Sequence, residues 1–390
     1  MGKRAAVLIA VLCAACGGGS TPTSPTLLSG PSTVPAVTIT GMPASLPVGG
    51  TAQLTATARL SNGTTQDCTN SATWESSDGT IASVSATGLV MTVAAGEAEI
   101  RATYQGTWAS VRVKVERPFG SGSLEIHYLD VGQGDAAILM TPSGETVMFD
   151  DGPGNCGIVT GTLGQLGATK IDYHIASHYH ADHIACAPQV FAAFPLRVGL
   201  DRGGSYSSGA FGSYLAAVVN ARQPAVPGST LTLDGGAVTI QIVAIGSGSD
   251  ENDRSIVAVV HFGEFDAEFG GDLTDAAEPS IASMMPRVEA YKVHHHGSAS
   301  ATSTAWLSAI MPKVAIISAG NGNPYHHPTQ SALDRLHHAS VKTYWTEMGS
   351  GATPQAAWDV VAGTVTIEVP TGGTRFTVRW NGGADTYMSW

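Results

Sequence analysis

The first third of the chain alternates between apolar and polar residues. Apolar positions two residues apart run through Leu54–Leu60 and again through residues 109–115, with polar residues between them. A period of two places the apolar side chains on one face, as in half-buried β-strands. Asn62-Gly63 and Asp78-Gly79 supply turns at a spacing typical of a small β-sandwich. The pattern predicts an all-β domain over residues 36–117.

From Leu124 onward the pattern changes to short apolar runs separated by helical segments. The runs predict buried strands, and a helical period predicts helices over 158–166 and 330–337. Strands with interspersed helices, in two similar halves, predict a layered α/β sandwich over 124–390 in which strands outnumber helices. The expected strands are 124–129, 136–140, 147–149, 171–176, 238–245, 256–260, 314–318, 365–369 and 375–380.

The N-terminal segment has the order of residues found in export signals. Basic residues precede an apolar run, Ala5–Ala15, that is too short to span a bilayer as a mature helix. Residues 1–16 resemble a bacterial lipoprotein signal with lipidation at Cys16, and a plain secretory signal is the alternative. Either version predicts export, and the first predicts a membrane-anchored lipoprotein facing the periplasm or the cell surface. Residues 17–35 are rich in Gly, Ser, Thr and Pro, which predicts a disordered tether.

Length, composition and charge limit the functional classes. A chain of 390 residues suits two to three units, and a hydrophobic content of 43% is sufficient for their cores. The 31 acidic and 19 basic residues give a formal net charge of −12, which disfavours a broad electrostatic grip on nucleic acid. A substrate phosphate would therefore be held locally, at a metal site.

One short stretch concentrates metal-binding side chains. Residues 177–183, Ser-His-Tyr-His-Ala-Asp-His, hold three imidazoles and a carboxylate, which are the ligand types that suit a Zn²⁺-like ion. They follow a predicted strand, at whose carboxyl end open α/β layers place their sites. We expect His178 and His180 to converge on one ion, and Asp182 and His183 to turn toward a second.

Later segments carry further ligands. Asp272 follows a strand and two glycines, and with one carboxylate oxygen on each ion it would bridge two cations. His295 or His296, within a run of three histidines, would complete the second ion's shell, and the sequence does not decide between them. The first ion lacks a third histidine, because residues 184–260 contain none. His261 lies in a predicted strand, where we expect a structural role.

The order of these motifs resembles one family. The H-x-H-x-D-H stretch has the form found in the metallo-β-lactamase superfamily, and its surroundings resemble the extracellular hydrolase domain of ComEC-type competence proteins. The resemblance implies an αββα metallo-β-lactamase sandwich over residues 124–390, without the transmembrane part of those proteins. The matching segments are Asp130–Ala136, Phe149–Gly152, residues 177–183, Asn252–Val257, Gly270–Leu273, Lys292–Ser298 and Asn323–Pro328.

The resemblance also implies roles for residues beside the metal loop. Asp150 is expected to orient the ligands by accepting a hydrogen bond from a ligating imidazole, as metal-bound histidines require. A turn aspartate is the alternative. Gln133 and Asp135, in a tight glycine-rich loop, are expected near the ligands without binding the ions, and so is Asp130.

Three residues are candidates for catalysis. Asp182 could orient or deprotonate the attacking water while it ligates. His327 and Ser298 are candidates for gripping a substrate oxygen or protonating a leaving group. A packed turn and a turn cap are the respective structural alternatives for these two.

Residues 36–117 resemble the group 2 bacterial immunoglobulin-like domain. The resemblance rests on Trp74–Asp78, Ile81–Val84, Gly88–Val90 and Gly96–Ala102. It implies a spacer or adhesive module that contacts the cell surface or wall.

Export places the remaining cysteines in an oxidising compartment, where they can pair. Cys156 and Cys186 each follow a predicted active-site loop, so we predict a disulfide between them. Cys68 is then left over, and we expect it to be a buried small hydrophobic residue.

These observations predict an exported metal-dependent hydrolase that uses one or two Zn²⁺ ions, with Mn²⁺ as the other option. The family resemblance implies phosphodiesters of DNA or of a nucleotide as the substrate class, attacked by a metal-activated water. Another ester, amide or lactone is the alternative substrate, because one fold supports many chemistries. The competing class is a non-catalytic surface protein that binds through its immunoglobulin-like unit. The sequence does not predict the oligomeric state.

Overall fold

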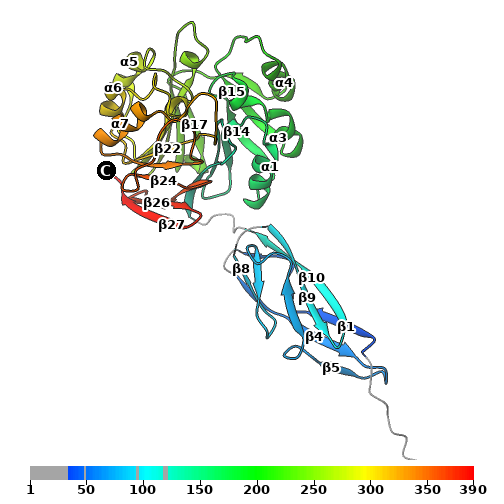
Figure 1. Cartoon of the computed structure of the whole chain (residues 1–390). Helices are drawn as coiled ribbons and strands as arrows, with labels where there is room; N and C mark the ends of the chain where they lie inside the picture. The colour runs from blue at the N-terminus through cyan, green and yellow to red at the C-terminus, as the bar shows by residue number, and fades with distance from the viewer. Residues whose placement is uncertain (1–33, 48–49, 94–95, 117–121) are drawn as a thin grey trace, which may run out of the picture.

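The chain folds into two units, one built only from strands and one from strands and helices (Figure 1). The structure is a computed structural model. It describes residues 34–47, 50–93, 96–116 and 122–390.

The predicted signal and most of the predicted tether lie outside the described residues. The end of the tether prediction is wrong, because Val34 is buried in the core of the first unit. Its carbonyl accepts a hydrogen bond from Thr107 Oγ1 at 2.7 Å. A single apolar residue in a polar segment gives no periodicity, so only the packing shows where the domain begins.

The first unit is a β-sandwich, as the alternating pattern predicts. Its three small sheets have the strand orders β1-β4-β5, β2-β10-β9-β6 and β3-β8-β7. Alternate residues of β9 point inward, and Ile100 is fully buried beside Leu54 and Val90. The strands are β1 (Ala36–Thr40), β2 (Leu46–Pro47), β3 (Thr51–Gln53), β4 (Thr55–Arg59), β5 (Thr65–Asp67), β6 (Thr73–Ser76), β7 (Ala82–Val84), β8 (Leu89–Thr92), β9 (Gly96–Tyr104) and β10 (Thr107–Glu116).

The second unit contains two large mixed sheets. The nine-stranded sheet has the order β16-β15-β14-β13-β12-β11-β25-β26-β27, and the eight-stranded sheet runs from β17 to β24 in sequence order. The strands of the first sheet are β11 (Ser123–Tyr128), β12 (Ala136–Met140), β13 (Thr146–Asp151), β14 (Ile171–Ile175), β15 (Leu196–Asp201), β16 (Arg222–Pro224), β25 (Val365–Pro370), β26 (Arg375–Trp380) and β27 (Gly383–Met388). Those of the second are β17 (Thr230–Leu233), β18 (Val238–Ile245), β19 (Ile256–Phe262), β20 (Phe265–Phe269), β21 (Ala290–Lys292), β22 (Val314–Ile317), β23 (Lys342–Trp345) and β24 (Asp359–Val361).

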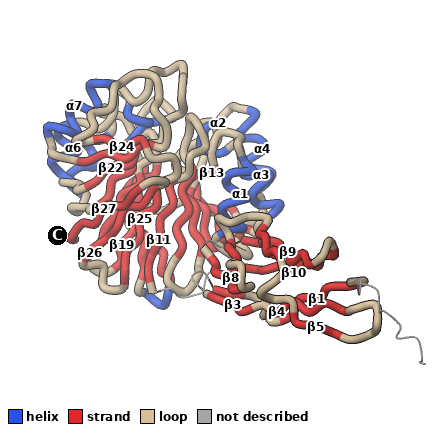
Figure 2. The backbone as a smooth tube through the Cα atoms, turned by 60° about the horizontal axis from the view of Figure 1, so that its bottom comes forward, coloured by secondary structure: helices blue, strands red, loops and turns tan. Residues whose placement is uncertain are grey.

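Helices cover the outer face of each sheet, so the layers follow the order αββα (Figure 2). Between the sheets, apolar residues of both, such as Ile126 and Val260, form the largest buried cluster. Separate clusters lie under the helices on either side. The α-helices are α1 (Cys156–Gln165), α2 (Ala181–Ile184), α3 (Ala187–Ala193), α4 (Gly209–Val218), α5 (Glu278–Ile281), α6 (Thr304–Ile310) and α7 (Gln330–His338). Four short 3-10 turns are η1 (Asp234–Gly236), η2 (Asn252–Arg254), η3 (Ala282–Met284) and η4 (His294–Gly297).

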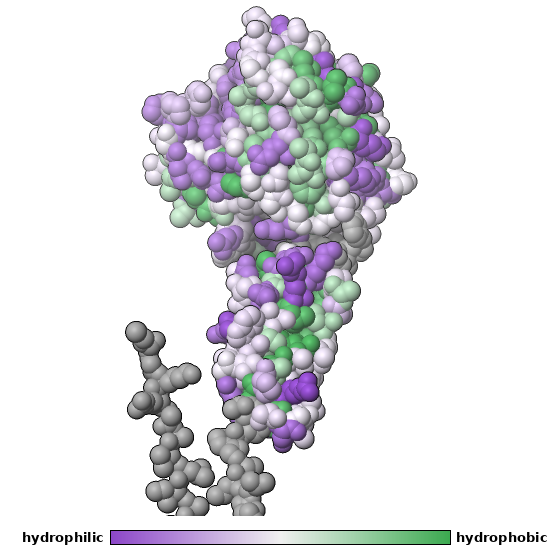
Figure 3. Space-filling model, turned by 90° about the vertical axis from the view of Figure 1, so that its right-hand side faces the viewer, coloured by the Kyte–Doolittle hydropathy of each residue, from purple (hydrophilic) through white to green (hydrophobic). Residues whose placement is uncertain are grey.

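The sequence predicts α1 and α7 but not the other helices. Helix α4 is apolar around most of its circumference and contains two glycines, so it shows no clear helical period. Figure 3, which views the molecule from the side of α1, α3 and α4, shows apolar surface between polar patches there. The packing of Phe211, Tyr214 and Val218 against the metal loop and α3 selects the helix. Helix α6 is only two turns long, with Ser303 capping its first turn.

Candidate metal centre

The predicted metal loop joins the two sheets at the carboxyl end of β14. Ser177 follows β14, and its carbonyl accepts a hydrogen bond from the N–H of Ile256, the first residue of β19, at 2.9 Å. The N–H of Asp135 donates to the Asp182 carbonyl at 3.1 Å. A Cβ at Gly134 would clash with this same carbonyl, so only glycine lets the two loops approach. The predicted strand therefore places its loop between both halves of the domain.

Four side chains of the second unit converge on one buried point. Asp135, His183, Asp272 and His296 are all buried, and each offers a ligand atom within 4.8 Å of the others. His183 Nε2, His296 Nε2, Asp272 Oδ1 and Asp135 Oδ1 have no hydrogen-bond partner among the described residues. Buried polar atoms without partners are costly unless a cation or water satisfies them. Imidazole nitrogens and carboxylate oxygens suit a divalent transition-metal ion, so the residues fit the predicted metal.

The hydrogen bonds of the histidines leave the right nitrogens for a cation. His183 Nδ1 lies 2.7 Å from Asp150 Oδ2, and His296 Nδ1 lies 2.9 Å from the carbonyl oxygen of Ser318. A proton on each Nδ1 leaves the lone pair of each Nε2 directed at the cluster. The Asp150 carboxylate also accepts hydrogen bonds from the N–H and hydroxyl of Ser177. Asp150 therefore holds both the loop and one imidazole, the geometry that the sequence analysis expects of it.

Asp272 lies at the centre of the site. Its Oδ1 is 3.3 Å from His183 Nε2. Its Oδ2 is 3.5 Å from His296 Nε2, 3.8 Å from His295 Nε2 and 3.9 Å from His178 Nε2. Asp272 Oδ1 thus faces one imidazole and Oδ2 faces three, so each oxygen could reach a cation.

The metal loop divides its side chains between two sides of Asp272. His178 Nε2 and His180 Nδ1 lie 3.0 Å apart. Asp182 Oδ2 faces the other way, 3.3 Å from His296 Nε2 and 3.9 Å from His183 Nε2. Which of these side chains hold the same cation stays a prediction.

The run of three histidines bends sharply, and the bend gives each ring a different direction. His295 and His296 have positive φ angles of 49° and 54°, in the left-handed region that non-glycine residues seldom adopt. This bend brings both Nε2 atoms to Asp272. The sequence does not decide which of His295 and His296 is a ligand. In the structure the Nε2 atoms of both lie near Asp272 Oδ2.

His294 supports the site without facing the cluster. Its ring is fully buried between two carboxylates, 3.1 Å from Glu268 Oε1 and 3.0 Å from Glu278 Oε1. Although burial opposes a charged ring, Glu268 and Glu278 raise the pKa of His294 to about 9. The imidazolium holds the start of the bend while His295 and His296 face the cluster. The sequence of three consecutive histidines does not show that the first of them, His294, has this role.

Asp135 and Asp130 differ from their predicted places. Asp135 belongs to the buried ligand group itself, and its Oδ2 lies 2.8 Å from Lys292 Nζ. Although burial opposes it, this ammonium holds the pKa of Asp135 well below its ordinary value. Asp130 is not among the residues that line the cleft, and its backbone N–H donates to Thr364 Oγ1 at 3.1 Å. Burial and the neighbouring carboxylate of Glu347 raise the pKa of Asp130 to about 6.

Of the remaining catalytic candidates, the structure brings His327 to the site but not Ser298. Ser298 Oγ lies 3.2 Å from Ser300 Oγ and does not line the cleft, which favours the turn role. His327 lines the cleft and stacks on the exposed ring of Tyr325 at a centroid distance of 5.8 Å. Burial and the imidazoles of His296 and His295 lower the pKa of His327 to about 4. His261 is exposed and pairs with Asp266 at 2.6 Å, as expected for a structural residue.

An open cleft of about 350 Å³ gives access to the cluster. Gln133 lines it, and Gln133 Oε1 accepts a hydrogen bond from the N–H of Gly320, whereas Gln133 Nε2 has no partner among the described residues. Asn252 Oδ1 is likewise buried and without a described partner. Asn252 and Tyr325 were not predicted as site residues, although they lie in the segments Asn252–Val257 and Asn323–Pro328 that carry the family resemblance. The cleft is lined by Gln133, His180, Ala181, Asp182, Asn252, Asp272, His295, His296, Tyr325 and His327.

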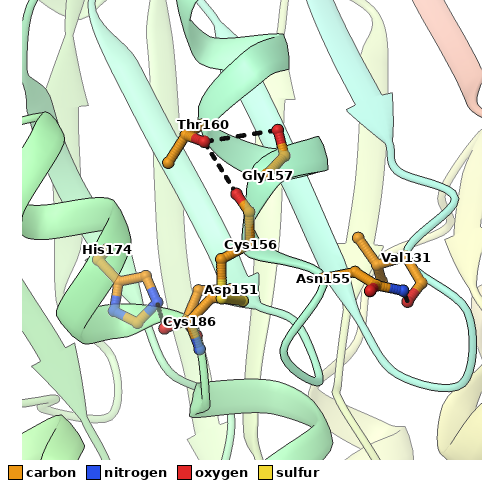
Figure 4. The surroundings of a disulfide bond; sticks show 8 residues. All are labelled: Val131, Asp151, Asn155, Cys156, Gly157, Thr160, His174 and Cys186. Carbon is orange, nitrogen blue, oxygen red and sulfur yellow. Dashed lines mark hydrogen bonds and ion pairs between the residues drawn. A yellow bond between two sulfur atoms is a disulfide. The ribbon is translucent and has the colours of Figure 1, made fainter.

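A disulfide anchors the chain that leaves the metal loop (Figure 4). Cys156 and Cys186 are bonded, with their Cα atoms 5.2 Å apart, which confirms the prediction. The N–H of Cys186 donates to Asp151 Oδ1 at 2.7 Å, and Asp151 directly follows the Asp150 that holds His183. Cys68 is a buried free thiol in the first unit, as expected.

Both units match models of known protein families. Residues 33–115 match the model of the bacterial Ig-like domain (group 2), and residues 129–320 match that of the metallo-beta-lactamase superfamily. The chain carries a bacterial Ig-like domain followed by a metallo-β-lactamase superfamily domain. The predicted fold class and family resemblance are therefore confirmed. The second domain belongs to this superfamily and carries a buried Asp/His group suited to a divalent metal.

Relatives of the metallo-β-lactamase domain include competence proteins. ComE operon protein 3 of Bacillus subtilis is 32% identical over 124 residues, which cover 31% of this chain and 16% of that protein. Competence protein ComA of Neisseria gonorrhoeae is 27% identical over 229 residues, 57% of this chain and 31% of that protein. The chain thus spans less than a third of the length of these relatives. Among solved structures, the metallo-beta-lactamase fold protein YhfI from Bacillus subtilis is similar with a TM-score of 0.40 at 13% identity, covering 59% of this chain and 99% of that one.

The competence relatives together with the Ig-like domain indicate an exported or cell-envelope protein. Among the described residues, no helix is long and apolar enough to cross a bilayer. The predicted lipidation site, Cys16, lies outside the described residues.

Proposed function

We propose that the metallo-β-lactamase domain is a two-cation phosphodiesterase that cleaves nucleic acid or a nucleotide. The observation that carries the proposal is the central position of Asp272, whose Oδ1 faces one imidazole and whose Oδ2 faces three. His178, His180 and His295 would hold one cation, and Asp182, His183 and His296 the other, with Asp272 shared. Asp135, whose carboxylate lies beside His183 and His296, would be a further ligand of the second cation. Zn²⁺ is the proposed metal and Mn²⁺ the alternative. When bound, the cations supply Lewis acidity and acidify water at neutral pH.

The chain's own residues would position and activate the reactants. The Asp182 carboxylate is partly exposed to the cleft, so it can accept a proton from an attacking water held there. His327 lines the cleft and, with its pKa lowered to about 4, is uncharged at neutral pH, so its ring could donate a hydrogen bond to a substrate oxygen. Gln133 lines the same cleft. Donors placed around cations suit the charge that develops on a phosphoryl group.

The substrate class rests on the competence relatives and on the shape of the site. The cleft is open and short, and the chain carries a net charge of −12, which favours a locally held phosphate over a long bound strand. Tyr325, 64% exposed at the rim, offers a flat ring on which a base could stack. The Ig-like domain would act as a spacer or contact module at the cell surface or wall. Lipidation at Cys16 would anchor the chain to a membrane.

The test combines metal content with turnover on several substrates. The full chain is purified, its metal is counted by elemental analysis, and hydrolysis of bis-p-nitrophenyl phosphate and single-stranded DNA is measured with added Zn²⁺ or Mn²⁺. We expect two ions per chain and phosphodiester turnover that is lost in Asp182→Ala with the fold retained. A carboxylic ester, a lactone and a β-lactam are run in parallel. Turnover of one of these alone would reassign the substrate class, and metal-free, inactive protein would favour a binding role for the Ig-like domain.

A further inference from the structure

A second cleft lies on the metallo-β-lactamase domain, formed by α6, the end of α7 and the C-terminal residues. Helices α6 and α7 lie beside the C-terminus in both Figure 1 and Figure 2. The cleft has a volume of about 830 Å³, larger than the metal cleft, and it shares no lining residue with it. A cleft of this size accommodates a small organic molecule.

The walls of this cleft expose apolar side chains. Leu307 of α6 is buried at its base, while Met311 and Trp390 are 46% and 52% exposed. Large apolar residues side by side on a concave surface bind apolar groups by excluding water. The Trp390 ring is held in place by cations, with Arg287 at 3.8 Å and Lys313 at 3.9 Å from its centroid.

Met311 occupies a backbone position that ordinarily suits glycine. It ends α6 in the left-handed conformation, with φ 46° and ψ 56°. Glycine is favoured there, because a Cβ raises the energy of this conformation. The position therefore offers a substitution that removes the side chain from the cleft without straining the helix end.

The charged groups of the cleft are basic. Lys313, Arg335 and His338 line it, and no Asp or Glu is among its described lining residues. Arg335 donates to the carbonyl oxygens of Ala299, Ala301 and Thr302, and Lys313 Nζ donates to that of Met388. These partners carry no full negative charge, although the carboxylate of Glu289 lies near Lys313 and partly offsets its charge. The basic side chains of this cleft contrast with the chain's net charge of −12.

From these features we infer that this cleft binds a small amphipathic organic anion. Its apolar body would lie against Leu307, Met311 and Trp390, and its anionic group would lie near Lys313 and Arg335. The site is independent of the metal centre, because no residue is common to both clefts.

Decanoate is a suitable probe, since it combines one carboxylate with an apolar chain. Calorimetric titration of the full chain should show saturable binding at one site with a Kd below about 1 mM. Decyltrimethylammonium, of the same chain length and opposite charge, should bind at least about tenfold more weakly. The Asp182→Ala variant should bind decanoate like the parent chain, which separates this inference from the proposed function.

Two variants locate the site. Met311→Gly should weaken decanoate binding about tenfold while the melting temperature stays the same or rises. Lys313→Gln should weaken it about threefold to fivefold. Met284→Ala, at an equally exposed methionine outside the cleft, and Lys170→Gln, at a distant lysine, are the matched controls and should bind normally.

Three outcomes would overturn the inference. The first is the absence of saturable decanoate binding. The second is unchanged affinity in both Met311→Gly and Lys313→Gln, which would put the bound molecule elsewhere. The third is equal affinity for decyltrimethylammonium, which would show that the basic side chains select no anion.

Discussion

The Ig-like domain and the metallo-β-lactamase domain treat buried polar groups in opposite ways. Among the described residues of the first, Thr69 and Thr92 are the polar residues that are buried. The second buries a dense set of ionisable groups, including His183, Asp272 and Lys292. Burying charge is unfavourable unless it is paired or bound to a metal. The described interior of the Ig-like domain is therefore almost entirely apolar, whereas that of the second domain holds ionisable groups that must be paired or bound to a cation.

Replacement of Asp272, the carboxylate at the centre of the cluster, should have the largest effect on the second domain. Asp272→Asn keeps the side-chain size but removes the charge that would neutralise two cations. We expect turnover to fall more than about 100-fold and bound metal to decrease, measured by steady-state kinetics and elemental analysis. Asp266→Asn, at a carboxylate paired with exposed His261, is the control and should stay active. Full turnover in Asp272→Asn would contradict the assigned centre.

Removal of metal should destabilise one domain and leave the other unchanged. A cation held at about 1,000 times its Kd stabilises the folded state by roughly 4 kcal/mol. Chelation should therefore speed hydrogen exchange in residues 171–185 and 290–298, measured by mass spectrometry on the full chain. Residues 96–116 of the Ig-like domain provide the internal control. Equal acceleration in both regions would mean that the metal does not act through the buried cluster.

Loss of the disulfide should have a smaller effect, again confined to the second domain. The bond joins residues that are 30 apart in sequence. Closing a loop of that length stabilises the fold by roughly 3–4 kcal/mol through the unfolded chain. The double variant Cys156→Ala, Cys186→Ala should lower the melting temperature of the metallo-β-lactamase domain in calorimetry. Cys68→Ala, the counterpart in the Ig-like domain, should leave that transition in place.

The smallest expected effect concerns Asp130 and its neighbour Glu347. The pKa of Asp130 in the folded chain, about 6, lies above its ordinary value in an unfolded chain. The folded state therefore binds more protons between about pH 4 and 6, and this residue destabilises the fold as the pH rises through that range. Asp130→Asn should raise stability at pH 8 by about 1 kcal/mol or less, because solvent screens the pair. At pH 4 the variant and parent should unfold alike in urea, and a gain at pH 4 alone would contradict the pairing.

Much of the candidate site follows from the sequence because its ligands are concentrated in short motifs. Residues 177–183 carry several ligand types on one loop, and Asp272 follows a strand and two glycines. The place of Asp135 is less predictable, because its distance from Lys292 depends on how β12 and β21 pack across the two sheets. Ser298 was predicted at the site because it follows predicted metal ligands in the sequence. In the structure its Oγ lies next to Ser300 Oγ within its own turn and does not line the cleft.

Local sequence patterns are enough to predict the two domains, the layered α/β class and the loop over residues 177–183 that carries the candidate ligands. Periodicity and motif spacing are local properties, and they survive in a linear chain. The tertiary structure alone decided that His295 and His296 both reach Asp272 while His294 turns back between Glu268 and Glu278. It also decided which nitrogen of each histidine faces the cluster. These outcomes depend on backbone angles and on partners far away in sequence, and three identical residues in a row carry no information about either.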